Sequence, residues 1–417
     1  MRAPTHAGLA LAALVLAAPA SARADEVLDW NAIMVATVGA QNPFAQGRLA
    51  AITQLAVFEA VNATTGKYQP YLNTLTAPAG ASPRAAAVAA AHGVLVHYFP
   101  AAAPTLDAAR TSSLAMIPDG PGKVDGIAVG EAAASAMIAH RANDGSATPQ
   151  FHLPPSSDPG EWQTTPACPP AGGVLRHWGD VAPFGIERRQ QFRSAPPPPL
   201  TSQIYARDYQ EVKEVGALDS SLRPPHKADI ARFYNVVLAV ATWNPAVSQA
   251  ASARGLSLAD NARLFALLNI AISDGLVAVM ETKYHYNFWR PETAIHSAAT
   301  DGNAATEPDP SFQPYIGTPC FPGYGSAHAT ASYAAREVAE ALLGEDAPSI
   351  SLSSAAVPGV VLHYTSFEDI TADIDDARVY GGIHFRFDQR AGARQGRRIG
   401  TWLSTHLLRP VHSGSGQ

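Results

Sequence analysis

The 417-residue chain has little charge, few cysteines and no long basic run. Charged residues make up 15 % of the sequence and hydrophobic residues 47 %, and the formal net charge is -6. This balance excludes intrinsic disorder, because disordered chains are polar and highly charged. Two cysteines are too few for a disulfide framework. The acidic balance also argues against nucleic acid as a partner.

Long apolar runs are missing too, apart from one near the N-terminus. Residues 1–24 combine Arg2, an apolar run over 7–18 and the small-residue end Ala22-Arg23-Ala24, which is typical of a secretory signal cleaved before Asp25. The alternatives are an uncleaved anchor or an ordinary buried helix. Cleavage leaves 27 basic against 35 acidic residues, a formal charge of -8. We therefore expect a secreted or periplasmic protein whose mature chain has no membrane span.

Helical periodicity dominates the rest of the sequence. Apolar residues recur at helical spacing over 49–58, 85–96, 257–289 and 329–343, and Gly344 stands where a helix often ends. Alternating strand patterns are scarce. Prolines and glycines punctuate 151–200, but this segment has large residues to bury: Trp162, Trp178, Phe184 and Phe192. The sequence predicts an all-α single domain over 25–417, with a long irregular but structured proline-rich excursion over 151–200.

The first polar motif is Lys283-Tyr-His-Tyr-Asn-Phe-Trp-Arg290-Pro291. If the helix continues to the proline, residues seven apart lie on nearly one face, so Lys283 and Arg290 point the same way. A lysine point charge and an arginine fork on one face suit an oxyanion. The alternative is a solvated basic face whose stems pack over Tyr284 and Trp289.

The second motif, Pro322-Gly-Tyr-Gly-Ser326-Ala327-His328, leads directly into a predicted helix. A helix start presents free backbone N–H groups and the positive end of the helix dipole to an anion. Ser326 could add a hydroxyl donor, and His328 could exchange a proton near neutral pH. The alternative is a plain serine N-cap followed by a surface histidine.

The third motif, Arg378-Val-Tyr-Gly-Gly-Ile-His384-Phe-Arg-Phe-Asp388, adds a third cation and a second histidine. His384 and Asp388 are four residues apart, so on a helix the carboxylate can fix the tautomer of the ring. Gly381 and Gly382 allow the backbone to approach closely beside the histidine. The alternative is a core histidine paired with a nearby aspartate.

The two cysteines leave two interpretations open. In an oxidising compartment Cys168 and Cys320 could form a disulfide, or they could remain two separate buried thiols. A bridge would brace the second motif, because Cys320 lies six residues before Ser326. A zinc site has no support, since neither cysteine has a close partner and Glu292 with His296 forms a single i,i+4 pair.

Taken together and in this order, the three motifs resemble the signature of the vanadium-dependent haloperoxidases. These share a superfamily with type 2 phosphatidic acid phosphatases and bacterial acid phosphatases. Further segments resemble the secreted bacterial branch, so that the resemblance covers nearly all of the mature chain: 30–31, 160–162, 183–184, 191–192, 197–200, 231–234 and 243–244. It implies two packed four-helix bundles in one domain, with an anion-binding catalytic core over 283–388.

The resemblance also implies a vanadate cofactor and a role for each motif residue. His384 matches the histidine that bonds the vanadium through a ring nitrogen, and His328 matches the acid–base histidine. The other residues that match the cofactor-binding set are three cations, a hydroxyl donor and a backbone N–H donor: Lys283, Arg290, Arg378, Ser326 and Ala327. Asp388, Phe321 and Met280 are expected around this set.

Several positions depart from the family pattern. Gly325 replaces the usual proline and Ala327 the usual glycine of the second motif, and Ala377 replaces the usual serine before the third. Met280 stands where a tryptophan usually lines the halide side, which leaves the halide open. Phe321 resembles the phenylalanine of chloroperoxidases.

Three functions follow as expectations. The first is a haloperoxidase that oxidises halide with hydrogen peroxide to a hypohalous acid-type species, which then attacks a small organic acceptor. The second is a secreted acid phosphatase or phosphoesterase that binds phosphate in the same pocket, with His384 as nucleophile and His328 as the acid for the leaving group. The third is a non-catalytic periplasmic anion-binding protein, suggested by the departures at Gly325, Ala327 and Met280.

Overall fold

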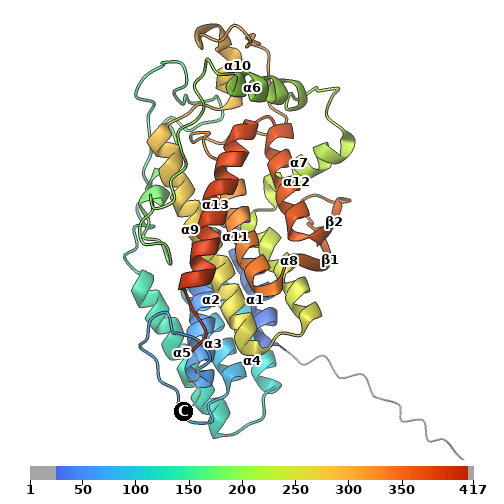
Figure 1. Ribbon diagram of the computed structural model, residues 1–417. Helices are drawn as coiled ribbons and strands as arrows, with labels where there is room; N and C mark the ends of the chain where they lie inside the picture. Colours follow the sequence, from blue (N-terminus) through green and yellow to red (C-terminus); the bar gives the residue numbers. More distant parts are fainter. Residues whose placement is uncertain (1–24, 412–417) are drawn as a thin grey trace, which may run out of the picture.

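The computed structural model describes residues 25–411, which form thirteen α-helices, three short 3₁₀ helices and one two-stranded sheet (Figure 1). The predicted signal segment 1–24 lies outside the described residues and stays a prediction. The elements, in chain order, are α1 Glu26–Val38, α2 Pro43–Thr65, α3 Pro83–Tyr98, η1 Pro100–Ala102, α4 Ala103–Ala115, α5 Pro121–Arg141, η2 Arg176–Asp180, α6 Gln203–Val215, α7 Pro225–Val236, α8 Ala239–Arg254, α9 Leu258–Tyr286, α10 Pro291–His296, η3 Ala298–Thr300, α11 Ala327–Leu343, β1 Asp346–Ser353, β2 Val361–Ser366, α12 Phe367–Tyr380 and α13 Arg386–His406.

The all-α class predicted from the periodicity is confirmed. Figure 1 shows an elongated body with α2 to α5 towards one end and α6 and α10 at the other. The predicted helices are present, and α2 and α3 begin before the predicted apolar stretches. Asn42 and Ser82 start them by accepting hydrogen bonds from first-turn amides, and a proline follows each.

Helix α9 is the centre of the core. It runs from the N-cap Ser257, as the sequence predicts, and packs against α2 on one side and against α11 and α13 on the other. By length and composition α9 could cross a membrane, but 94 % of its most apolar stretch is buried inside the fold. A core helix passes the same test, and α9 joins the N-terminal helices to the C-terminal ones.

The C-terminal helices α11 and α13 are in unusually close contact. Gly392, Gly396 and Gly400 recur every four residues on α13. A Cβ atom on Gly396 would lie 2.4 Å from the carbonyl oxygen of Thr330, so only glycine allows the backbone of α13 to approach α11 this closely. The approach places the first turn of α13 beside the start of α11, where the Ser326 amide donates to the Asp388 carbonyl at 3.0 Å.

The proline-rich excursion over 151–200 is irregular but packed, as predicted. It contains only η2, and Trp162 is fully buried while Trp178 is 5 % exposed. The carboxylate of Asp274, in the middle of α9, accepts hydrogen bonds from the amides of Phe184, Gly185 and Ile186 at 2.6–2.9 Å. This contact anchors the excursion to the core helix.

The small sheet is a feature that we did not predict. Strands β1 and β2 pair antiparallel, with Ile350 opposite Tyr364 and Leu352 opposite Leu362. Ile350 and Leu352 are buried while Ser349, Ser351 and Ser353 are exposed, so β1 has the period-2 pattern of a half-buried strand. Only two apolar residues of β1 alternate with polar ones in this way. So short a pattern does not distinguish a strand in a sequence that is otherwise dominated by helical periodicity.

Candidate active site

A narrow pocket of about 50 Å³ lies where the ends of several helices meet. One wall is polar and is formed by side chains from four separate elements: Arg290 before α10, His328 on α11, Arg378 on α12 and His384 before α13. The rest of the lining is mostly apolar and includes Phe44, Leu276 and Phe321. The three motifs therefore converge on one site.

The expectation that Lys283 and Arg290 share one helical face is wrong. Helix α9 ends at Tyr286, and Asn287 adopts a left-handed conformation with φ of 45°, which asparagine tolerates better than most residues. Arg290 is extended because Pro291 follows it. The two cations still come together, since the Lys283 Nζ atom and the Arg290 Cζ atom lie 5.4 and 5.0 Å from the centre of the same Phe321 ring.

Lys283 lies behind the pocket wall. Its side chain is fully buried, and its Nζ atom donates to the carbonyl oxygens of Pro322 and Gly323 at 3.0 and 2.7 Å. Burial, reinforced by the positive charge of Arg290, holds the pKa of Lys283 well below its ordinary value. The lysine contributes a charge to the site without lining the pocket.

The two arginines keep donors available for a ligand. Arg290 donates from Nε to the Phe321 carbonyl at 3.0 Å and from Nη1 to the Ile383 carbonyl at 2.9 Å, but within residues 25–411 its buried Nη2 has no partner. Arg378 donates from Nη1 to the Tyr234 carbonyl at 3.1 Å, and its buried Nε likewise has no partner in the described chain. Buried donors of this kind are normally satisfied, so these two are available to an anion that enters the pocket.

The tautomer of His384 is determined by its two neighbours. Arginine only donates, so the His384 Nε2 atom, 2.9 Å from Arg290 Nη1, must be an acceptor. The ring proton is therefore on Nδ1, which donates to the Asp388 carboxylate at 2.8 Å. Burial and the nearby cations hold the pKa of His384 well below its ordinary value. Nε2 is thus the unprotonated nitrogen, and its lone pair accepts from Arg290 in this structure.

Asp388 contacts His384 as expected, although only Asp388 belongs to a helix. It lies in the first turn of α13, while His384 precedes that helix. The same carboxylate oxygen accepts from the Phe385 amide at 3.1 Å. Burial raises the pKa of Asp388 to about 7, and Lys283 and Arg290 oppose this rise. With three cations and one carboxylate, the site carries an excess of positive charge.

His328 lies in the first turn of α11, and its Nε2 atom is 3.1 Å from the carbonyl oxygen of Tyr234. A carbonyl only accepts, so Nε2 carries the proton and Nδ1 is free. Burial and Arg378 hold the pKa of His328 well below its ordinary value, so the ring is neutral. The Tyr234 carbonyl, in the last turn of α7, thus accepts hydrogen bonds from both His328 and Arg378. We did not predict this acceptor from the sequence. Carbonyl groups in the last turn of a helix generally lack a partner within the helix, so they can accept from side chains elsewhere.

The start of α11 is a potential anion site, as the second motif predicts. Ser326 is the N-cap, and its Oγ accepts from the Ala329 amide at 3.3 Å, which leaves the hydroxyl hydrogen for another acceptor. Ala327 lines the pocket as the first helical residue, so it needs no positive φ and an alanine fits where the family has glycine. Ser326 is fully buried and does not line the pocket.

The apolar wall differs in part from the expectation. Phe321 lines the pocket, whereas Met280 is fully buried in the core and is not among the lining residues. Phe44 takes part instead: its ring lies edge-on to Phe321 at 6.4 Å and is backed at 5.8 Å by Trp178 from the excursion. A tryptophan is therefore present behind this wall, but it comes from a different part of the chain.

Comparison with known proteins agrees with the fold and with the family that the motifs resemble. Residues 263–413 match the family model described as the VCPO second helical-bundle domain. The chain is similar to a solved bacterial vanadium-dependent iodoperoxidase, with 25 % identity and a TM-score of 0.75 over 92 % of this chain and 96 % of that one. It is also similar in fold to a holo-type bacterial vanadium-dependent chloroperoxidase, with 16 % identity and a TM-score of 0.70 over 88 % and 93 % of the two chains. No curated protein matches the sequence.

Proposed function

Because this chain belongs to the vanadium haloperoxidase family, we propose that it is a vanadate-dependent haloperoxidase that oxidises a halide with hydrogen peroxide. The product would be a hypohalous acid-type species that halogenates small organic acceptors. The observation that carries the proposal is that two buried guanidinium donors without a partner in residues 25–411, Arg290 Nη2 and Arg378 Nε, belong to side chains that line one pocket together with His384. An oxyanion would satisfy both donors, and the His384 Nε2 atom, which now accepts from Arg290 Nη1, is the nitrogen ligand beside it.

The residues present fit vanadate. His384 would bond the vanadium through Nε2 in place of the hydrogen bond that this atom now accepts from Arg290 Nη1. Arg290 Nη2, Arg378 Nε and the Ala327 amide would donate to the oxygens of the anion, and the Ser326 hydroxyl would donate from the residue next to Ala327, outside the present pocket lining. When bound, vanadate supplies a Lewis-acid centre that activates peroxide. Lys283 would add its charge from behind the wall, where carbonyl groups orient it without neutralising it.

The protein's own contribution is charge and proton control. The three cations would stabilise negative charge that develops on oxygen atoms in the pocket, and so would favour oxidation of a halide there. His328 starts neutral, with Nδ1 free to take a proton from hydrogen peroxide, while its Nε2–H remains on the Tyr234 carbonyl. Asp388 keeps the His384 proton on Nδ1 and so preserves the Nε2 lone pair.

The size of the pocket favours small reactants. Its volume of about 50 Å³ and its apolar residues Phe44, Leu276 and Phe321 suit a small reactant such as peroxide or a halide ion. The same cations would nevertheless hold phosphate, so phosphate-ester hydrolysis with His384 as nucleophile is the alternative that the experiment must separate.

We also propose that the protein acts outside the cytoplasm. The pairing of Cys168 with Cys320 supports this, because stable disulfides form mainly in oxidising compartments. The sequence of residues 1–24 supports it independently. N-terminal sequencing of the secreted protein should start at Asp25, and an intact N-terminus on soluble cytoplasmic protein would contradict the proposal.

A paired assay tests the proposed activity. Purified protein from Asp25 onward is loaded with orthovanadate and assayed for peroxide-dependent halogenation of a phenol with iodide, bromide and chloride in turn. A second sample without vanadate is assayed for hydrolysis of a phosphate ester. We expect halogenation that is lost in His384→Ala and retained in His97→Ala, a matched change at an exposed histidine on α3. Ester hydrolysis without halogenation would establish the phosphatase alternative, and neither activity would favour the non-catalytic one.

A further inference from the structure

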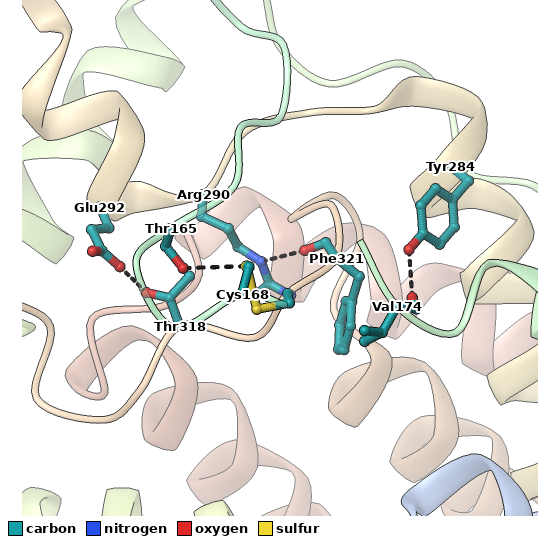
Figure 2. Close-up of a disulfide and its surroundings, with 9 residues drawn as sticks. Thr165, Cys168, Val174, Tyr284, Arg290, Glu292, Thr318 and Phe321 are labelled. Atoms are coloured by element: carbon teal, nitrogen blue, oxygen red, sulfur yellow. Dashed lines mark hydrogen bonds between the residues drawn. A yellow bond between two sulfur atoms is a disulfide. The ribbon is translucent and has the colours of Figure 1, made fainter. Parts of the chain in front are cut away.

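The disulfide between Cys168 and Cys320 joins the proline-rich excursion to the segment just before α11, with the two Cα atoms 5.4 Å apart (Figure 2). We propose that this disulfide is a positioning element of the active site, because it holds the backbone carbonyl groups that orient Lys283 and Arg290. The inference rests on the proposed function only in taking vanadate as the anion. We call residues 320–323 the carbonyl loop.

The carbonyl loop holds both cations through consecutive backbone groups. Phe321 accepts from Arg290 Nε at 3.0 Å, and Pro322 and Gly323 accept from Lys283 Nζ at 3.0 and 2.7 Å. Neither cation forms a salt bridge within residues 25–411. Carbonyl dipoles therefore set the positions of two basic side chains that no carboxylate neutralises by direct contact in the described residues.

The excursion fixes the other side of the carbonyl loop. The Val174 amide donates to the Cys320 carbonyl at 2.8 Å, and the Tyr284 hydroxyl donates to the Val174 carbonyl at 2.5 Å. Figure 2 shows both hydrogen bonds beside the disulfide: Arg290 donates to the Phe321 carbonyl and Tyr284 donates to the Val174 carbonyl. Tyr284 is the neighbour of Lys283 on α9, so the excursion connects the loop back to the helix that carries the lysine.

The disulfide is the one covalent tie among these contacts. The remaining ties of the segment are hydrogen bonds, from Thr318 to Glu292 and from the Gly323 amide to the Phe288 carbonyl. Cys168 itself belongs to no helix or strand and is only partly buried. Without the sulfur bond, the carbonyl loop can shift relative to α9 and α10, and the cations move with it. Loss of such a supporting contact typically weakens the affinity of a bound metal centre by about 10- to 100-fold.

The test uses the Cys168→Ala/Cys320→Ala double variant and two independent measurements. Hydrogen–deuterium exchange of peptides spanning 284–292 and 320–326 reports on the carbonyl loop without any anion. Equilibrium dialysis with orthovanadate reports the dissociation constant. The control is Leu106→Ala, which removes a buried core side chain on α4 and lowers stability without touching the loop.

We expect the double variant to exchange at least about tenfold faster in the loop peptides and to bind vanadate about 10- to 100-fold more weakly. Leu106→Ala should lower only the melting temperature. Unchanged loop exchange in the double variant, with a lower melting temperature, would overturn the inference. The disulfide would then stabilise the fold without positioning the carbonyl loop. If the wild-type protein does not bind vanadate, the proposed function fails, whereas the exchange experiment still decides the role of the disulfide.

Reduction of the folded protein covers the case in which the double variant does not fold. A water-soluble phosphine cleaves the S–S bond to two thiols and is itself oxidised to the phosphine oxide, with the oxygen coming from water. The thiols are then blocked and the phosphine is removed. Faster exchange confined to 284–292 and 320–326 is the expected result, and exchange equal to that of the untreated protein would contradict the inference.

Discussion

The most direct test of the anion site is the change Arg378→Met. Arg378 is buried, 3 % exposed, and donates to a single protein group, the Tyr234 carbonyl. That carbonyl still accepts from His328 when the arginine is gone. Methionine fills much of the same volume, and replacing a buried, poorly paired charge by an apolar side chain is often neutral or stabilising. We therefore expect the melting temperature without anion to stay the same or to rise.

The effect on anion binding should be large. A unit charge at about 4 Å from an anion contributes about 4 kcal/mol at an effective dielectric constant of about 20. This corresponds to a loss of about 10³-fold in affinity, since about 1.4 kcal/mol changes a binding constant tenfold. The pKa of His328 should rise at the same time, because Arg378 is the main charge that lowers it. Equilibrium dialysis with orthovanadate measures the affinity, and the chemical shift of the histidine against pH measures the pKa.

The matched control is Arg263→Met. Arg263 is a partly buried arginine near the other end of α9, and its Nε donates to one carbonyl, that of Leu408, at 2.8 Å. Its loss removes the same charge and the same kind of contact without touching the pocket, so the dissociation constant for vanadate should not change. If Arg378→Met binds vanadate within about threefold of the wild type, or if the two variants lose affinity equally, the assignment of Arg378 to the anion is refuted.

Three further predictions concern protons, packing and the disulfide. Binding of orthovanadate near pH 6 should be accompanied by proton uptake, because the anion offsets the cations that depress the pKa of His328; calorimetry in two buffers of different ionisation enthalpy measures the uptake, and equal heats in both buffers would contradict it. Gly396→Ala should lower the free energy of unfolding by about 1–3 kcal/mol, because the new methyl group meets the Thr330 carbonyl at 2.4 Å; urea unfolding tests this, and a stability equal to that of the wild type would show that α13 can move freely. Removing both cysteines should cost about 5 kcal/mol in unfolding free energy by the loop-entropy relation for a sequence separation of 152, to be measured by denaturant unfolding against the oxidised wild type; a loss below about 1 kcal/mol would mean that the unfolded chain gains little freedom.

Much of the fold could be predicted from local patterns. The all-α class and the packed excursion follow from apolar spacing, prolines and buried aromatics, which act within a few residues of each other. The strands β1 and β2 were missed because their buried alternation is very short. The end of α9 was misplaced by three residues, because the left-handed turn at Asn287 has a weaker sequence signal than the proline that follows at 291.

The candidate site, like the fold, could be predicted only in part. The sequence alone identified the cations and histidines, because their residue types and spacing are unusual in an otherwise apolar chain. It determined neither the tautomers of His384 and His328 nor the shared acceptor Tyr234, because these depend on which atoms of distant segments meet.

What the sequence by itself determined is the chemical inventory: a chain of few charges with three motifs that supply the candidate site with three cations, two histidines and one aspartate. What only the tertiary structure decided is their convergence, the exclusion of Met280 from the pocket and the pairing of Cys168 with Cys320. The physical reason is the sequence separation of the residues that interact. Local spacing governs helices and caps, whereas the close approach of α13 to α11 and the anchoring of the excursion on α9 set the distances between groups far apart in the chain.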